Sequence, residues 1–118
     1  MKEFPIIELC YDFTVWMNER IRRFPRNERY SIGLRVENKL LDFLDTLVEA
    51  RYTRKRAEIL RRAVVQLECL RFHVRLLRDL GLFNSNRYEY ASEKLLEIGR
   101  QLGGWMKAGG SDKDEERG

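Results

Sequence analysis

Apolar residues recur at helical spacing in four segments of the 118-residue chain, and short polar or glycine-containing breaks separate these segments. The first segment predicts a helix from about Pro5 to Phe24, because proline suits a first helical turn and Pro25 ends the helix behind it. Its apolar stripe comprises Ile6, Leu9, Phe13, Trp16 and Ile21.

The second segment predicts a helix that starts between Asn27 and Ser31 and extends to about Ala50. Its apolar residues are three or four positions apart and would share one helix face. They are Ile32, Val36, Leu40, Phe43 and Leu47, and Leu41, Leu44 and Val48 widen that face.

The third segment predicts a helix from about Thr53, a suitable N-cap, to Leu80, where Gly81 provides a natural stop. The fourth follows Asn84-Ser85-Asn86, and Asn86 with Glu89 fits a capping box. Its stripe comprises Tyr88, Ala91, Leu95, Ile98, Leu102 and Trp105. Gly99 and Gly103 lie one turn apart, where another backbone could approach closely.

Four helices joined by short loops predict an all-α fold, an antiparallel four-helix bundle over residues 1–108. Residues 109–118 form a charged, glycine-bounded segment that we expect to be disordered. No run approaches the roughly 18 apolar residues of a membrane span, and the N-terminus does not resemble a signal peptide. We therefore expect a cytoplasmic protein.

The third helix carries two apolar stripes, which a bundle standing alone would not need. One stripe comprises Leu60, Ala63, Leu67, Leu70, Val74 and Leu77, and the other comprises Val65, Cys69, Phe72, Leu76 and Leu80. The second stripe would either meet a wide groove of the same bundle or pack against another subunit. Exposed apolar patches are uncommon in monomers, so self-association is favoured, with Val65, Phe72 and Leu76 at the interface.

Positive charge concentrates in one part of the chain. Residues 51–80 carry 9 basic and 3 acidic side chains, net +6, whereas the segments on either side are each net −1. Such a block suits a polyanion such as nucleic acid or an acidic protein surface, although a bare charge excess slightly favours a well-solvated helix. The candidate nucleic-acid-binding residues are Arg22, Arg23, Arg26, Arg29, Arg54, Lys55, Arg56, Arg61, Arg71, Arg75 and Arg78.

Two observations favour more ordinary roles for parts of this set. Glu68 and Asp79 lie close enough in sequence to pair with the arginines of the third helix. Phe24 and Tyr30, beside the arginines around Pro25, could stack on bases but are more often core anchors at a helix boundary.

The sequence offers little for catalysis, metal or cofactor binding. Cys10 and Cys69 are interpreted as reduced, packed thiols rather than a disulfide, and His73 alone cannot complete a zinc site. No glycine-rich phosphate loop, nucleophile elbow or zincin motif occurs. We therefore expect a protein that is not an enzyme and needs no cofactor.

Several joined motifs resemble the accessory variability determinant (Avd) proteins of diversity-generating retroelements. They are FPRNERYSIGLRVENKLLDFLDTLVEA at 24–50 and YEYASEKLLEIGRQLGGWMKA at 88–108, with YDFTVWM and CLRFHVRLLRDLG fitting the same family. Proteins encoded in ribosomal RNA intervening sequences are more distant relatives, which share the FP-x-x-E-x-Y-like turn.

The resemblance implies a four-helix bundle that assembles into a basic homopentameric barrel. It also implies a non-catalytic protein that binds nucleic acid and the reverse transcriptase of the element, and supports template-RNA-primed cDNA synthesis in mutagenic retrohoming. Two alternatives remain: a structural homo-oligomeric bundle for protein interaction, and a bundle associated with ribosomal RNA.

Overall fold

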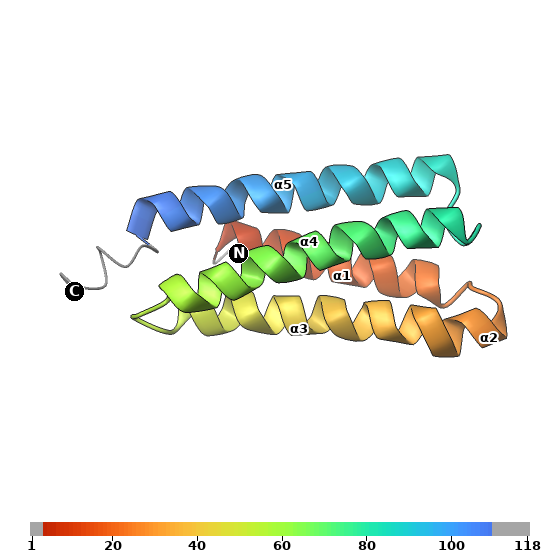
Figure 1. Ribbon diagram of the computed structural model, residues 1–118, viewed down its shortest axis with the longest axis horizontal. Helices are drawn as coiled ribbons and strands as arrows, with labels where there is room; N and C mark the ends of the chain where they lie inside the picture. The colour runs from red at the N-terminus through yellow and green to blue at the C-terminus, as the bar shows by residue number, and fades with distance from the viewer. Residues whose placement is uncertain (1–3, 110–118) are drawn as a thin grey trace.

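The computed structural model describes residues 4–109 and confirms a chain built from helices, with no strand in that range (Figure 1). Four long helices form the body, and a short helix with a π-helical turn leads into the second of them. The elements are α1 (Pro5–Ile21), α2 (Arg26–Glu28), η1 (Arg29–Gly33), α3 (Leu34–Arg51), α4 (Ala57–Asp79) and α5 (Ser85–Gly109).

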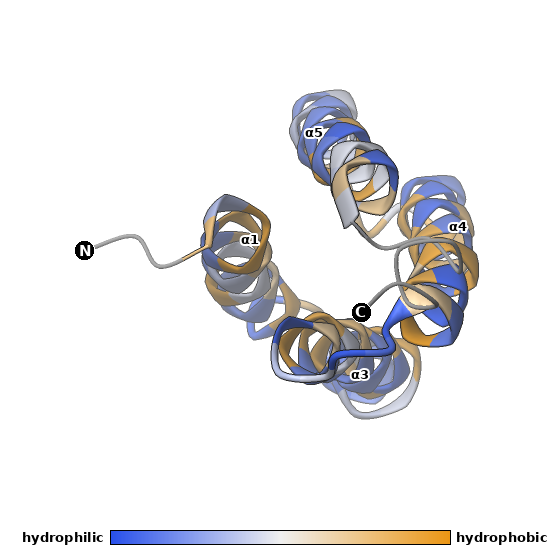
Figure 2. Cartoon of the chain, turned by 90° about the vertical axis from the view of Figure 1, so that its left-hand side faces the viewer, coloured by the Kyte–Doolittle hydropathy of each residue, from blue (hydrophilic) through white to orange (hydrophobic). Residues whose placement is uncertain are grey.

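The four long helices surround a common axis in the order α1, α3, α4, α5, so that each packs against two neighbours (Figure 2). Consecutive long helices run in opposite directions, as the short turns between them require. The resulting antiparallel bundle measures 51 × 28 × 23 Å. No helix within residues 4–109 has an apolar stretch of the length that a membrane crossing requires.

The predicted stripes form most of the core. Every residue of the first α4 stripe, from Leu60 to Leu77, is buried, as are the α5 stripe residues Ala91, Leu95, Ile98, Leu102 and Trp105. Burying a leucine-sized side chain stabilises the fold by about 1.5–3 kcal/mol, so these stripes dominate its stability. The prediction was wrong for Leu41 and Val48, which remain about 40% exposed because they point away from the axis, and it missed Met17.

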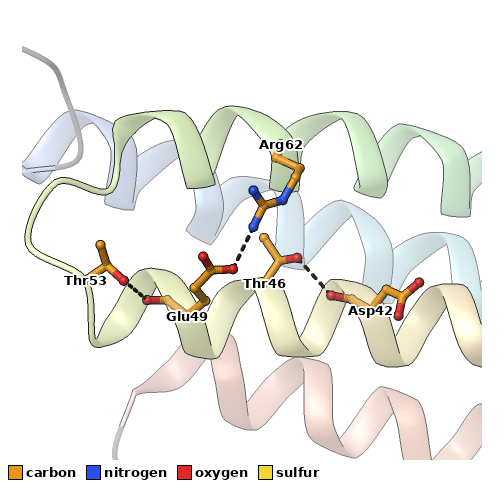
Figure 3. Close-up of polar contacts among 5 residues, drawn as sticks. All are labelled: Asp42, Thr46, Glu49, Thr53 and Arg62. Atoms are coloured by element: carbon orange, nitrogen blue, oxygen red, sulfur yellow. Dashed lines mark hydrogen bonds and ion pairs between the residues drawn. The ribbon is translucent and has the colours of Figure 1, made fainter.

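The ends of two helices differ from the prediction. Helix α1 ends at Ile21 rather than Phe24. Thr53 does not cap α4: its hydroxyl donates 2.7 Å to the Glu49 carbonyl and so closes α3, and α4 begins four residues later (Figure 3). Beside it, Arg62 of α4 contacts the Glu49 carboxylate at 2.6 Å and ties the two helices together.

Helix α5 begins earlier than the proposed capping box at Asn86 and Glu89. The Asn84 side-chain oxygen accepts a 2.8 Å hydrogen bond from the Arg87 backbone N–H, which makes Asn84 the cap. Gly81 ends α4 with a φ of 77°, confirming the predicted stop, because this conformation is strained for other residues. Helix α5 continues through Gly109, and the remainder of the segment expected to be disordered lies outside the described residues.

Candidate nucleic-acid interface

Three of the candidate residues, Arg71, Arg75 and Arg78, form a row on α4, and Arg71 and Arg78 place this row along the border with α5. A guanidinium nitrogen of Arg71 is 3.4 Å from the Glu68 carboxylate, and the same group packs over Gly99. Arg78 contacts Asp79 at 3.0 Å and stacks 4.4 Å from the centre of the Tyr88 ring. The close backbone approach expected at Gly99 and Gly103 does not occur among the described residues: the Arg71 side chain covers Gly99, and a Cβ at Gly103 would meet nothing within 4 Å.

Arg75, between these two arginines, is exposed and makes no ion pair with any described residue. It is the member of the row with the most freedom to meet a phosphate. Arg78 lines a surface hollow between α4 and α5. Glu89 and Glu93 line the same hollow, and their carboxylates would repel an anion. Phosphate contact along this border is therefore best centred on Arg75 and Arg71.

The arginines around Pro25 form a second group at one end of the bundle (Figure 1). Arg22, Arg23 and Arg26 are exposed, whereas Arg29 is half-buried. Arg29 donates 3.1 Å to the Arg22 carbonyl, and its guanidinium lies 4.9 Å from the centre of the Tyr30 ring. The two aromatic residues of this turn behave differently: Phe24 is buried in the core, but Tyr30 is exposed.

A third group lies at the other end of the bundle, in the turn between α3 and α4. Arg54 and Lys55 are exposed. Arg56 is half-buried, donates 3.0 Å to the Thr53 carbonyl, and lies 5.8 Å from the centre of the Trp105 ring. Arg51, which was not among the predicted residues, joins this group.

Arg51 stands at the last turn of α3, and its guanidinium lies 5.2 Å from the Phe4 ring centre and 5.4 Å from that of Tyr52. Its position beside Arg54–Arg56 in the sequence was a visible signal. What the sequence could not show was the aromatic surroundings, since Phe4 is 47 positions away and reaches it only through the tertiary fold.

The predicted residues other than Arg61 thus fall into three separate groups. Arg71, Arg75 and Arg78 lie together, whereas the Pro25 group and the α3–α4 turn are at opposite ends of a bundle 51 Å long. Arg61 lies near the start of α4 and contacts Glu58 at 3.6 Å. A short oligonucleotide would reach only one end, and a longer strand would have to follow the helices.

The second stripe of α4 is exposed in the single chain. Val65, Phe72 and Leu76 are 62%, 63% and 40% exposed, and Leu80 and Cys69 on the same side are also exposed. The stripe does not fit a groove of its own bundle, which was the alternative to an intersubunit position. It forms an apolar surface with no cover inside the described chain.

A small hollow of about 130 Å³ lies between α3 and α4 beside this stripe, lined in part by Lys39, Asp42, Cys69 and His73. Burial lowers the pKa of His73, and the nearby charges of Lys39 and Arg35 lower it further. Its Nδ1 atom is buried without a hydrogen-bond partner. His73 is therefore held in its neutral form at pH 7.

The two cysteines are both free thiols. Cys10 is fully buried, and burial raises its pKa to about 12. Cys69 is exposed, contrary to the expectation that both thiols are packed. Among residues 4–109, no group of three His, Cys, Asp or Glu side chains is placed to hold a metal ion.

Comparison with known proteins identifies the family. The family model described as bAvd-like matches residues 6–109, which include the four long helices except Pro5 of α1, and the three basic groups. No curated protein is similar enough to the chain to count as a match. Because the family match extends over nearly the whole chain, the chain belongs to the bAvd-like family.

Proposed function

We propose that this chain is a non-catalytic accessory protein of a diversity-generating retroelement. It binds nucleic acid and the reverse transcriptase of the element in the cytoplasm, and it supports cDNA synthesis in mutagenic retrohoming. The observation that carries this proposal is the bAvd-like match across residues 6–109. The net +6 charge of residues 51–80 and the exposed position of Arg54, Lys55 and Arg75 support nucleic-acid binding.

The proposed working form is a homo-oligomer, a pentamer by resemblance to the Avd proteins. The exposed stripe around Val65, Phe72 and Leu76 supports it, because burial of such a stripe between copies would remove apolar surface from water. Repetition of the basic groups around a ring would multiply phosphate contacts and so raise affinity for a long RNA. The protein would then hold template RNA beside the polymerase without performing chemistry.

A structural bundle for protein interaction is the second candidate. The ion pairs of Arg61 with Glu58, Arg71 with Glu68 and Arg78 with Asp79 favour it, since these arginines already meet acids within their own helix. A bundle associated with ribosomal RNA is a third candidate, and it shares the expectation of RNA binding.

A salt titration of RNA binding separates the first two candidates. Phosphate contacts make log affinity fall with log salt, with a slope of roughly −0.7 per contact on a single strand. Replacing Arg71, Arg75 and Arg78 with glutamine should weaken binding and flatten the slope. A matched variant with glutamine in place of Arg87, Lys94 and Arg100 of α5 loses the same net charge. It should change the slope less than the α4 variant does.

Two results would count against the proposal. Binding that shows no salt dependence in the unaltered protein would favour the interaction bundle. Equal slopes in the two triple variants would mean that net charge, rather than the α4 row, determines binding.

A further inference from the structure

The start of α1, the α3–α4 turn and the end of α5 lie toward the viewer in Figure 2. Residues of these segments line an apolar recess. It lies where the α3–α4 turn, the start of α1 and the last turns of α5 meet. Its volume is about 490 Å³, within the range of about 300–1,000 Å³ that is usual for small-molecule sites. The residues that shape it include Phe4, Ile6, Arg56, Gln101, Gly104 and Trp105, and none of the described lining residues is acidic.

The recess combines aromatic surface with positive charge. Phe4 and Trp105 meet edge to face with ring centres 4.7 Å apart. Arg56 lies against Trp105, and Arg51 lies against Phe4 with its buried Nε atom lacking a hydrogen-bond partner. The exposed Arg54 and Lys55 stand on the same turn as Arg56. A ligand that fits must therefore offer an apolar part beside negative charge.

We propose that this recess takes an unpaired nucleobase of a single-stranded nucleic acid whose phosphates follow the α3–α4 turn. The inference rests on the proposed function and names the part of the nucleic acid that this end of the bundle recognises. Bases of any sequence can lie against aromatic rings, while the attached phosphates meet lysine and arginine. The amide of Gln101 offers both a donor and an acceptor to the edge of a base.

Charge complementarity selects this occupant. Each nucleotide places a phosphate close to its base. This arrangement matches the recess, where the Phe4 and Trp105 rings lie beside the guanidinium groups of Arg51 and Arg56. An acidic peptide would also meet the cations, but its carboxylates and its apolar side chains come from different residues. At the recess each of these two cations lies over an aromatic ring, Arg56 over Trp105 and Arg51 over Phe4. This proximity favours a nucleotide over an acidic peptide.

Two neighbouring glycines of α5 provide a matched pair of variants. Gly104 lines the recess and Gly103 does not, and a Cβ added at either position meets nothing within 4 Å. Gly104→Leu should fill the recess without replacing a charged residue. Gly103→Leu makes the same chemical change on the same helix, outside the recess, and both remove a glycine that is unfavourable in a helix.

The experiment measures the affinity of the full chain for a 12-nucleotide RNA and for an RNA of equal length and charge that lacks its bases. The wild type should bind the RNA with bases about tenfold more tightly, since contact of one base with aromatic side chains is worth roughly 1–3 kcal/mol. Gly104→Leu should lose that preference and leave affinity for the abasic strand unchanged. Gly103→Leu should keep it.

The outcomes distinguish this inference from the function on which it rests. Equal wild-type affinity for the two strands would overturn the recess proposal while leaving salt-dependent RNA binding intact. The recess proposal would also be overturned if Gly104→Leu kept the preference for the strand with bases. If Gly104→Leu kept this preference and instead no longer co-purified with the reverse transcriptase, the occupant of the recess would be a peptide. No binding of either strand would remove the proposed function itself. The abasic comparison uses the unaltered chain, so a wild type without a preference for bases overturns the recess proposal even if a variant fails to fold.

Discussion

Gly33 lies against Ile21 so closely that a Cβ at position 33 would stand 2.9 Å from the Ile21 Cγ2 atom. The same Cβ would also be 3.1 Å from the Glu28 carbonyl oxygen. Gly33 is the last residue of the π-helical turn η1, which places the start of α3 against the end of α1. The absence of a side chain at Gly33 therefore allows the start of α3 to pack closely against the end of α1.

Gly33→Ala should destabilise the protein. Overpacking costs about 1–3 kcal/mol, because Ile21 is buried and stiff, and the higher helix propensity of alanine returns about 1 kcal/mol. We expect a net loss on the order of 1 kcal/mol and a fall in Tm of roughly 4 °C. Gly99→Ala is the control: its Cβ would meet the guanidinium of Arg71, 2.7 Å away, which can move. Thermal unfolding in which the two variants lose equal stability would contradict this account.

Phe72→Glu should break the proposed homo-oligomer. A carboxylate in the middle of the stripe that includes Val65 and Leu76 would have to be desolvated at a subunit interface. Phe72 is 63% exposed in the single chain, so the monomer should keep its helices. Native mass spectrometry of the wild type should show an oligomer, and of the variant mostly monomer. Leu96→Glu, at an exposed apolar site on α5, should leave the assembly intact; a wild-type monomer at micromolar concentration would refute the interface.

Cys69 should report on the same interface through its reactivity. Its thiol is exposed beside the stripe, whereas Cys10 is buried with a pKa of about 12. At pH 8 the Cys10 thiolate is scarce, so iodoacetamide should modify only Cys69 in the folded chain. Assembly through the stripe should slow that labelling, and Phe72→Glu should speed it at least several-fold. Mass spectrometry of the labelled peptides checks both expectations, and equal rates for the wild type and the variant would place Cys69 outside the interface.

His73 should make stability fall in mild acid. Burial, Lys39 and Arg35 lower its pKa in the folded state, so below pH 6.5 the unfolded chain binds a proton that the folded chain resists. The contribution is present above pH 6.5 and is lost as pH falls, by less than about 1.4 kcal/mol per pH unit for a single proton. Urea unfolding at pH 7.5 and 5.5 should show a larger loss for the wild type than for His73→Gln. Identical losses would mean that carboxylates alone govern the acid response.

The sequence was sufficient to predict the helices and the bundle, because apolar spacing directly reflects which face of each helix is buried. It was less informative about helix ends. Thr53 and Asn86 both have suitable cap chemistry, but the hydroxyl of Thr53 bonds back to Glu49, and Asn84 caps α5 instead. Such choices depend on competing local hydrogen bonds that a pattern of residues does not rank.

The basic residues other than Arg51 were found from the sequence, but the separation of their groups in space was not. Arg54 and Arg26 both belong to basic clusters near turns, yet the antiparallel fold puts these clusters at opposite ends. The aromatic contacts of Arg51 and Arg56 bring Phe4 and Trp105 from the two ends of the chain. Charge along the sequence therefore indicates the class of ligand that we propose, while the placement of the cations beside aromatic rings depends on the tertiary fold.

The most direct test of the proposed function is cDNA synthesis by the reverse transcriptase of the element on its own RNA, with and without this protein. We expect the protein to co-purify with the enzyme and cDNA yield to depend on its presence, since a basic oligomer raises the local concentration of RNA at the polymerase. The triple glutamine variant of Arg71, Arg75 and Arg78 should assemble normally yet support less cDNA. Equal cDNA yield with and without the protein, together with no co-purification, would contradict the account.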